Sequence, residues 1–470
     1  MGDLIVCEIR CPIHGFIGLN EWEKRVVDNP VFQRLRRIRQ LAWTDHVYPS
    51  AMHSRFEHSL GVMHVATRLF DSIVSNSSEI LKSVYGYTDL GLLRDRQKVR
   101  LAALLHDVGH SPFSHGSEEL FPEKPMPELK TGDASKKPVT KKRYRHEDYT
   151  VALIRGSLQD AIDGDDWNRR NYGITAQEVA AIIDGTPDAG PALFWRDLLI
   201  GQLDADRMDY LMRDSYHIGV NYGRYDLHRL VSTIRALADV GREQKTPRIG
   251  VSTGGWYAAE ELIVARYSMH KQVYFHKTRG AYDIHLRGAM QNLLPGGAYP
   301  APRGEELKQY LKWDDWKVLG LLAEGNGETD GQRLLTRNHF RLVYQSRENP
   351  KDVDELAKNE AELRAVKAAL GTLIAANKLY PNNWYKADSG DIPVQNDRDP
   401  ADVRPLSDYS SLLRKFTANE QELLYVKPED VSGAKRIVQE VTKSDHSPQM
   451  NIEFPGGSKG GRKKEVASAS

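Results

Sequence analysis

The residues best suited to chemistry lie in one short stretch, where an apolar run ends in histidines and a carboxylate. Leu104-Leu105 is followed by His106-Asp107, and further histidines stand at positions 110 and 115. Adjacent imidazole and carboxylate groups offer the mixed nitrogen and oxygen ligands of a divalent cation, unlike the thiolates of most structural zinc sites. Half of the 16 histidines fall between His46 and His146. We therefore expect a metal site here.

Two further segments offer ligands of the same kind. His58 stands at the expected start of a helix, and Asp204, Asp206 and Asp209 crowd the start of another. In this last segment one helix face carries a set of residues whose later members lie four, seven or eight, and eleven positions after the first. They are Asp206, Tyr210, Arg213 or Asp214, and His217.

A second polar stripe follows the same spacing further along the chain. Its members are Arg266, His270, Tyr274 and Lys277. Cationic, imidazole and aromatic groups on one face suit a triphosphate and a sugar, although a merely solvated face is the alternative. We interpret His46, His53 and His64 as structural. Cys7, Cys11 and His14 lack a fourth ligand nearby, so a strand and turn is preferred there over a zinc knuckle.

The elements that must position these residues are mostly helical. Apolar residues recur every three or four positions in several segments, which predicts amphipathic helices. The predicted helical segments are parts of 30–110, 148–158, 175–183, 193–213, 227–238, 258–294, 305–322, 331–337, 353–376 and 431–442. Short strands are expected at 248–252 and 425–427. The fold class is therefore mainly α, with an all-helical catalytic core and a smaller mixed α/β or helical C-terminal region.

Composition suggests how the chain is divided. We expect a catalytic domain at 1–295 with an inserted basic, proline-containing loop at 117–145. Residues 296–443 would form a regulatory or oligomerisation region, and the polar stretch 444–470 a disordered tail. Lys and Arg (65) nearly balance Asp and Glu (64), so nucleic acid is not indicated. Two cysteines and no apolar signal or membrane-spanning stretch predict a cytoplasmic protein.

At these motifs the sequence resembles the HD superfamily, in the branch of the deoxynucleoside triphosphate (dNTP) triphosphohydrolases. That branch includes bacterial dGTP triphosphohydrolases and vertebrate enzymes with a sterile alpha motif. The resemblance covers roughly residues 9 to 290. The segments that carry it are Pro12–Gly15, Phe32–Arg36 with Gln40-Leu41, Arg55–Val62, His106–His115 and Asp204–Tyr210.

The resemblance implies roles for individual residues. It implies metal ligation by His58, His106, Asp107 and Asp206. It implies phosphate contacts by Arg55, His110, His115, Arg207 and Arg266, with Lys277 as a further candidate, beside His270 on the same stripe. Deoxyribose contacts fall to Gln40, Leu41, Tyr210, Asp214 and Tyr274, and acid/base function to His115, His146 and Glu118.

The implied reaction is hydrolysis of a dNTP to a deoxynucleoside and triphosphate, with Mn, Fe, Mg or Zn as the cofactor. Asp28 and Arg36 match positions that hold an activating nucleotide in the allosteric vertebrate enzymes. An effector nucleotide, a homo-oligomer (dimer, tetramer or hexamer) and a role in dNTP depletion against phage are further hypotheses. The alternatives are an HD-type phosphodiesterase or nuclease, and a non-catalytic nucleotide sensor.

Overall fold

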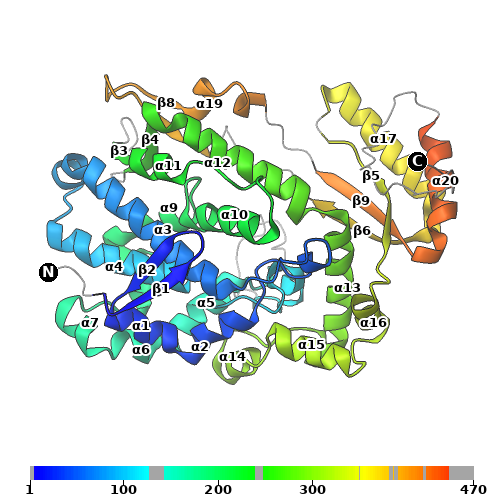
Figure 1. Ribbon diagram of the computed structural model, residues 1–470, viewed down its shortest axis with the longest axis horizontal. Helices are drawn as coiled ribbons and strands as arrows, with labels where there is room; N and C mark the ends of the chain where they lie inside the picture. The colour runs from blue at the N-terminus through cyan, green and yellow to red at the C-terminus, as the bar shows by residue number, and fades with distance from the viewer. Residues whose placement is uncertain are drawn as a thin grey trace, which may run out of the picture.

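The structure is a computed structural model that describes residues 5–125, 142–238, 247–348, 350–380, 385, 390–415 and 420–443. A helical body makes up most of it, and a smaller lobe near the C-terminus lies at one end of the long axis (Figure 1). The mainly helical fold class is thereby confirmed. The predicted tail at 444–470 and the lysines of the predicted loop at 136, 137 and 141 lie outside the described residues.

The long helix α3 (Arg55–Asn76) is the centre of the helical body. It packs against α4 (Asp89–Leu105) and α10 (Ala205–Ile218), and its apolar face is fully buried. The body is completed by α1 (Glu21–Asp28), α2 (Pro30–Gln33), α5 (His146–Arg155), α6 (Gln159–Asp163), α7 (Asp166–Asn171), α8 (Ala176–Asp184), α9 (Asp197–Ile200), α11 (Leu227–Thr233), α12 (Trp256–Met269), α13 (Lys277–Leu293), α14 (Gly304–Tyr310), α15 (Asp315–Ala323), α16 (Glu328–Thr336) and α19 (Leu406–Tyr409).

Helix starts place two of the predicted ligands. Ser54 and Glu57 form a reciprocal capping box at the start of α3, and His58 directly follows Glu57. The carboxylate of Asp204 accepts a hydrogen bond from the backbone N–H of Arg207 at 2.8 Å and so caps α10. His58 and Asp206 therefore both project from the first turn of a helix.

Two small sheets flank the helical body. Strands β1 (Cys7–Cys11) and β2 (Gly15–Leu19) form an antiparallel hairpin, which confirms the predicted strand and turn. Strands β3 (Ile234–Leu237), β4 (Arg248–Ser252), β7 (Pro393–Gln395) and β8 (Val403–Pro405) form the second sheet in that order. The predicted strand at 248–252 is confirmed, but the helix predicted over 227–238 was wrong past Thr233. The backbone there pairs with β4 instead, a long-range partner that periodicity does not reveal.

The helix predicted over 258–294 is divided into two. After α12 the chain makes one π-helical turn (His270–Tyr274), and it leaves helical geometry at His276, whose φ and ψ are −58° and 130°. A new helix, α13, then begins at Lys277. The angular phase of the side chains is therefore reset between Tyr274 and Lys277.

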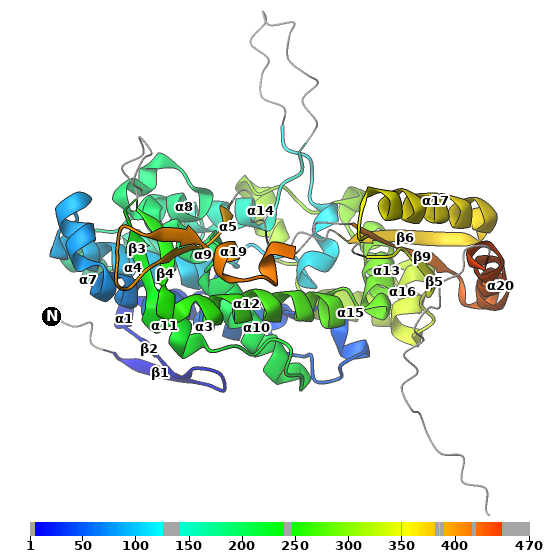
Figure 2. The ribbon, with the colours of Figure 1, turned by 90° about the horizontal axis from the view of Figure 1, so that it is seen from above.

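The C-terminal lobe contains a three-stranded sheet of β5 (Arg341–Gln345), β9 (Gln421–Val426) and β6 (Ile374–Tyr380), in that order. Helices α17 (Val353–Leu370) and α20 (Val431–Thr442) pack against each other, and both lie beside this sheet (Figure 2). The predicted strand at 425–427 and helix at 431–442 match β9 and α20. The run predicted as helical to 376 ends at Leu370, because Gly371 takes a φ of +46° and turns the chain into β6.

The main core continues beyond residue 295. Tyr299, Tyr310, Val318 and Leu334 pack with the same hydrophobic cluster as the helices before them. A separate small core, which includes Val366, lies within the lobe. The packing thus joins α14, α15 and α16 to the helical body.

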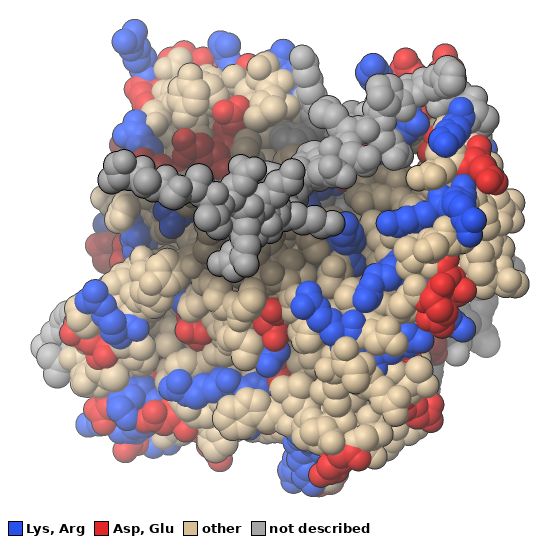
Figure 3. All heavy atoms as spheres, turned by 45° about the vertical axis from the view of Figure 1, so that its right-hand side comes forward, with Lys and Arg blue, Asp and Glu red and all other residues tan. Residues whose placement is uncertain are grey.

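The surface carries both signs of charge. Lys and Arg side chains are interspersed with Asp and Glu on the face in Figure 3 that brings the lobe forward, in keeping with a net charge of +1. Within the described residues, no helix combines the length and apolar character that crossing a bilayer requires.

Candidate active site

One cavity of about 760 Å³ collects most of the predicted site residues. It opens between α5, α10, the end of α12 and α13, and the start of α3 contributes to it. Its lining includes Gln40, Leu41, Arg55, His106, Asp107, His110, His115, His146, Asp206, Arg207, Tyr210, Asp214, Arg266, His270 and Tyr274.

The four predicted metal ligands converge at this cavity, which His106, Asp107 and Asp206 line, while the side chain of His58 is fully buried beside them. The Nε2 atom of His58 lies 3.0 Å from Oδ1 of Asp206 and 3.6 Å from Oδ2 of Asp107. The Nε2 atom of His106 lies 3.3 Å from Oδ1 of Asp107 and 3.7 Å from Oδ1 of Asp206. Both Nε2 atoms are buried and have no hydrogen-bond partner among the described residues. Two imidazole nitrogens and two carboxylates facing one point therefore fit a divalent cation.

The second ring nitrogen of each histidine is already used. Nδ1 of His58 donates to Oδ2 of Asp209 at 2.8 Å, and Nδ1 of His106 lies 2.8 Å from the carbonyl oxygen of Ala103. Donation from Nδ1 leaves a lone pair on Nε2 and fixes the orientation of the ring. Both rings are thus prepared to ligate through Nε2.

Asp209 is itself held by two other buried groups. Its Oδ1 lies 2.6 Å from Nε2 of His14, and Arg213 donates to both carboxylate oxygens at 2.8 and 2.9 Å. Gly61 of α3 permits this approach, because a Cβ atom there would lie only 1.9 Å from Oδ1 of Asp209. The sequence motifs around Gly61 and Asp209 therefore form one packed unit behind the metal ligands.

The electrostatics of the group are those of a cation site. Burial raises the pKa of Asp107, but the charge of Arg55, which pairs with it, holds that pKa well below its usual value. Burial lowers the pKa of His58, yet the neighbouring carboxylates of Asp206 and Asp209 raise it to about 10. A bound cation would neutralise the negative charge that Asp206 and Asp209 concentrate around the His58 ring.

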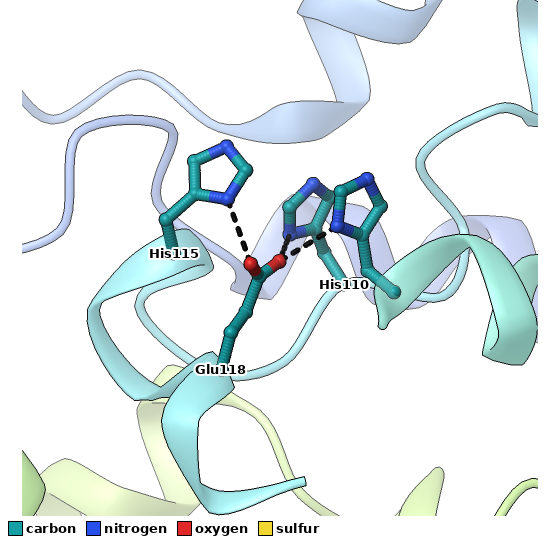
Figure 4. Close-up of side chains that lie close together, drawn as sticks. His110, His115 and Glu118 are labelled. Atoms are coloured by element: carbon teal, nitrogen blue, oxygen red, sulfur yellow. Dashed lines mark hydrogen bonds and ion pairs between the residues drawn. The ribbon is translucent and has the colours of Figure 1, made fainter. Parts of the chain in front are cut away.

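A second histidine cluster lies beside the first and is organised around Glu118. The rings turn toward its carboxylate (Figure 4). Nδ1 of His146 lies 2.7 Å from Oε1, Nδ1 of His115 lies 3.0 Å from Oε2, and Nδ1 of His110 lies 3.3 Å from Oε1. Burial lowers the pKa of His146, but the charge of Glu118 and the hydrogen bond to it raise it overall. This cluster can therefore hold and deliver a proton.

Gly109 brings the two clusters together. A Cβ atom there would lie 2.3 Å from the carbonyl oxygen of His146 and from the backbone nitrogen of Thr150. Thr150 also accepts a hydrogen bond from the Gly109 N–H at 3.0 Å and donates to the carbonyl of His106 at 2.9 Å. The start of α5 consequently lies against the metal-binding turn, and the rings of His146 and His110 stack at 3.9 Å.

Cationic side chains surround the metal group. Arg207 lies 3.0 Å from Asp204, and Arg55 donates to Ser114 at 2.7 Å. Burial lowers the pKa of Arg266, and the charge of nearby Arg207 adds to that effect. Arginines held close together against their mutual repulsion suit a polyanionic ligand.

Asp214 forms the centre of a small polar pocket. Its Oδ2 accepts a hydrogen bond from the hydroxyl of Tyr274 at 2.6 Å, and its Oδ1 lies 2.7 Å from Nε2 of His53. The ring of Tyr210 lies 6.0 Å from that of Tyr274. His53, interpreted from the sequence as structural, is buried and in this way positions Asp214.

Three predicted residues lie elsewhere. Lys277 does not line this cavity but a separate hollow with His339 and Lys435, because the break after the π-helical turn changes its direction. Asp28 is exposed and pairs with Lys24, and the guanidinium of Arg36 lies 3.5 Å from the ring centroid of Phe56. Neither Asp28 nor Arg36 lines the described cavity.

The structure adds cavity residues that the sequence patterns did not indicate. Arg279 and Asp283 of α13 line it, as do Lys378 and Tyr380 of β6. A one-turn spacing on α13 could have revealed the first pair once the start of that helix was known. The second pair belongs to the C-terminal lobe, and no pattern in the local sequence indicates that it lines the cavity.

Comparison with known proteins agrees with this geometry. The chain matches the HD domain over residues 55–214 and the HD associated region over residues 225–441. It is 30% identical over 354 residues to the uncharacterized protein YwfO of Bacillus subtilis, covering 71% of this chain and 70% of that protein. It is 27% identical over 432 residues to the deoxynucleoside triphosphate triphosphohydrolase SAMHD1 homolog of Dictyostelium discoideum, covering 88% of this chain and 74% of that protein.

A solved structure shows the same fold over nearly the whole chain. The crystal structure of a hypothetical protein from Aquifex aeolicus superimposes with a TM-score of 0.70 at 26% identity, covering 93% of this chain and 100% of that one. The ligand geometry, both family matches and these relatives agree with one another. The chain is an HD-domain phosphohydrolase, in the branch of the family that includes the dNTP triphosphohydrolases.

Proposed function

We propose that this protein is a metal-dependent dNTP triphosphohydrolase that converts a dNTP and water into a deoxynucleoside and triphosphate. The observation that carries the proposal is the pocket of Asp214 beside the metal group. Tyr274 and His53 orient the carboxylate of Asp214. Asp214 lines the same cavity as Asp206 and Arg266. A sugar and a polyphosphate would then lie on either side of the reacting phosphorus.

The sugar pocket supports a deoxyribose. The Asp214 carboxylate can accept a hydrogen bond from a 3′-hydroxyl. The ring of Tyr210 lies between the metal group and this pocket, 6.5 Å from the ring of His58 and 6.0 Å from that of Tyr274. Tyr210 would occupy the space that a 2′-hydroxyl needs, so a ribonucleotide would bind poorly.

The arginines stabilise the charge of the reaction. A divalent cation held by the four ligands would supply Lewis-acid assistance at the α-phosphate. Arg55, Arg207 and Arg266 would bind the phosphate oxygens as negative charge spreads over them during attack by water on the α-phosphorus. A bond forms between the water oxygen and phosphorus, and the bond from phosphorus to O5′ breaks.

The Glu118 cluster supplies the proton for the leaving oxygen. His146 has a raised pKa and is held by Glu118, and His115 is the more exposed member of the cluster. Protonation of O5′ by His146 or His115 releases a neutral 5′-hydroxyl, and the proton lost by water restores the cluster. Atoms and charge therefore balance without a further reactant.

A direct assay tests the proposal. Purified protein with Mn²⁺ or Mg²⁺ is incubated with each dNTP singly and in mixture, and the products are resolved by anion-exchange chromatography. Triphosphate and deoxynucleoside in equal amounts would support it. Pyrophosphate with a nucleoside monophosphate, or no turnover under any mixture, would refute it. Cleavage of a cyclic nucleotide or single-stranded DNA instead would favour a phosphodiesterase.

The mixture also tests regulation. We propose that the protein forms a homo-oligomer and that a nucleotide effector regulates its activity. Asp28 and Arg36 match positions that hold an activating nucleotide in the allosteric vertebrate enzymes. A second dNTP that raises turnover of the first, together with a concentration-dependent mass in solution, would support this. Equal turnover with and without a second dNTP in a monomer would exclude it.

A further inference from the structure

The turn that leads into His115 has a strained backbone. Phe113 and Ser114, which lie between His110 and His115, have φ values of +57° and +54°. Residues other than glycine rarely adopt this left-handed conformation, and two in succession are less favourable still. Contacts from outside the turn must therefore keep it, and the imidazole that follows it, in place.

A buried carboxylate of α15 provides such a contact. Oδ1 of Asp315 accepts a hydrogen bond from the backbone N–H of Phe113 at 2.7 Å, and Oδ2 accepts one from the backbone N–H of Arg39 at 2.9 Å. Asp315 is only 1% exposed. A carboxylate buried this deeply is costly unless its oxygens are hydrogen-bonded, so both N–H groups are held closely. One side chain thus fixes the turn relative to the segment that precedes Gln40.

The same two segments are joined a second time, on the side of the cavity. The hydroxyl of Ser114 donates to the carbonyl oxygen of Arg39 at 2.6 Å and accepts from Nε of Arg55 at 2.7 Å. Arg55 and Gln40 both line the cavity. The Asp315 carboxylate therefore lies behind a connected set of groups that ends at the catalytic cavity.

Two tyrosines from the segment before α15 hold the turn at its ends. The hydroxyl of Tyr310 donates to the carbonyl oxygen of Gly109 at 2.7 Å, and the hydroxyl of Tyr299 lies 2.9 Å from that of Ser117. Ser117 belongs to the same short helix as Glu118. Together with the carboxylate of α15, the two tyrosines contact the turn at three points.

We propose, on the basis of the proposed function, that Asp315 is a positioning residue for protonation of the leaving O5′ oxygen. By holding Phe113 in its left-handed conformation, the carboxylate sets the direction of His115. It also sets the place of Glu118, whose carboxylate holds His146. Asparagine at this position keeps one oxygen acceptor but turns an NH₂ group toward the second N–H donor. The turn then relaxes and delivers the proton less efficiently, while the metal ligands stay in place.

A substrate whose leaving group needs no proton tests this role. In a 5′-thio analogue of the dNTP, sulfur replaces O5′, and the P–S bond breaks with its electron pair leaving on sulfur as a thiolate. Values of kcat for the dNTP and for this analogue are measured with the native protein and with Asp315→Asn. The variant is expected to lower kcat by about 100-fold for the dNTP and by about threefold or less for the analogue, with metal content unchanged.

The neighbouring carboxylate provides the matched control. Asp314 accepts the backbone N–H of Lys317 at 2.9 Å and pairs with Arg37, and no hydrogen bond or ion pair among the described residues joins it to the turn. Asp314→Asn should therefore change kcat for the two substrates by the same factor. Tyr310→Phe should lower kcat for the dNTP by about 10-fold more than for the analogue, and it remains informative if Asp315→Asn does not fold.

The outcomes separate this inference from the proposed function. Equal losses on the two substrates, or no loss on either, in Asp315→Asn or in Tyr310→Phe overturn the positioning role alone. Release of triphosphate from neither substrate by the native protein overturns the proposed function and this inference with it.

Discussion

Two histidine clusters share one cavity, and they use their imidazole nitrogens in different ways. In the metal group, His58 and His106 use Nδ1 for a carboxylate and a backbone carbonyl and leave Nε2 without a hydrogen-bond partner among the described residues. In the Glu118 cluster, the Nδ1 atoms of three rings face a single carboxylate. Both clusters contain atoms close enough to hold a metal ion.

The difference separates a cation site from a proton site. A metal ion needs lone pairs on several atoms that face one point, which the Nε2 atoms and two carboxylates of the metal group provide. In the Glu118 cluster the carboxylate of Glu118 already interacts with the rings, so a cation would have to displace those contacts. We therefore expect one bound metal ion per chain, held by the metal group.

The largest effect is expected on removal of a metal ligand. His106→Ala should lower kcat/KM for a dNTP by about 1000-fold or more, because the cation and its charge stabilisation are lost together. Metal content measured by plasma mass spectrometry should fall from about one to near zero per chain. A variant that keeps both its metal and its activity would contradict the ligand assignment.

The next effect separates the clusters. Glu118→Gln should lower kcat by about 100-fold through loss of proton delivery, while the metal content stays at about one per chain. Loss of the metal in this variant would mean that the Glu118 cluster is the cation site. Glu305→Gln, an exposed carboxylate of α14, serves as the control.

The same variant has a signature in the pH profile. Glu118 raises the pKa of His146, so the protonated ring persists above the usual range and activity should fall only as pH rises through that raised pKa. Without the negative charge, the fall should begin at lower pH. An unchanged alkaline limb in Glu118→Gln would exclude His146 as the acid.

A smaller effect is expected one layer further out. Asp209→Asn should weaken metal affinity by about 10- to 100-fold, because Asp209 orients the His58 ring from its Nδ1 side. The measurement is titration with Mn²⁺ followed by activity and by electron paramagnetic resonance of free Mn²⁺. Unaltered metal affinity would limit Asp209 to packing.

The smallest of these effects concerns the sugar pocket. Tyr274→Phe removes the hydrogen bond to Asp214 and should lower kcat/KM for dNTPs by about 10-fold without changing metal content. Tyr257→Phe, an exposed tyrosine of α12, is the matched control. Equal losses of kcat/KM in both variants would contradict a role of Asp214 in sugar binding.

Local motifs predicted much of this site because its parts lie at helix starts and in one tight turn. His58, Asp107 and Asp206 lie in such positions, and their convergence follows from the packing of α3, α4 and α10. Lys277 was extrapolated along a helix that the π-helical turn interrupts, which the spacing of polar residues does not show. The position of Lys378 beside Asp283, 95 residues away, depends on how the lobe packs against α13.

The fold shows the same division between local and long-range information. Helices such as α8 and α20 were predicted close to their observed bounds, whereas the helix predicted over 193–213 is interrupted before α10 begins at Ala205. The strand β3 was missed, because its four residues are defined by pairing with β4 and not by their own pattern. Tertiary pairing thus outweighed a helical periodicity that continued past Thr233.

Hydrolysis in ¹⁸O-labelled water tests the central claim most directly. Attack by water on the α-phosphorus predicts one ¹⁸O atom in the released triphosphate and none in the deoxynucleoside, both readable by mass spectrometry. Label in a nucleoside monophosphate or in pyrophosphate would show attack at a different bond or phosphorus. Either result would contradict the assignment of this cavity to dNTP triphosphohydrolysis.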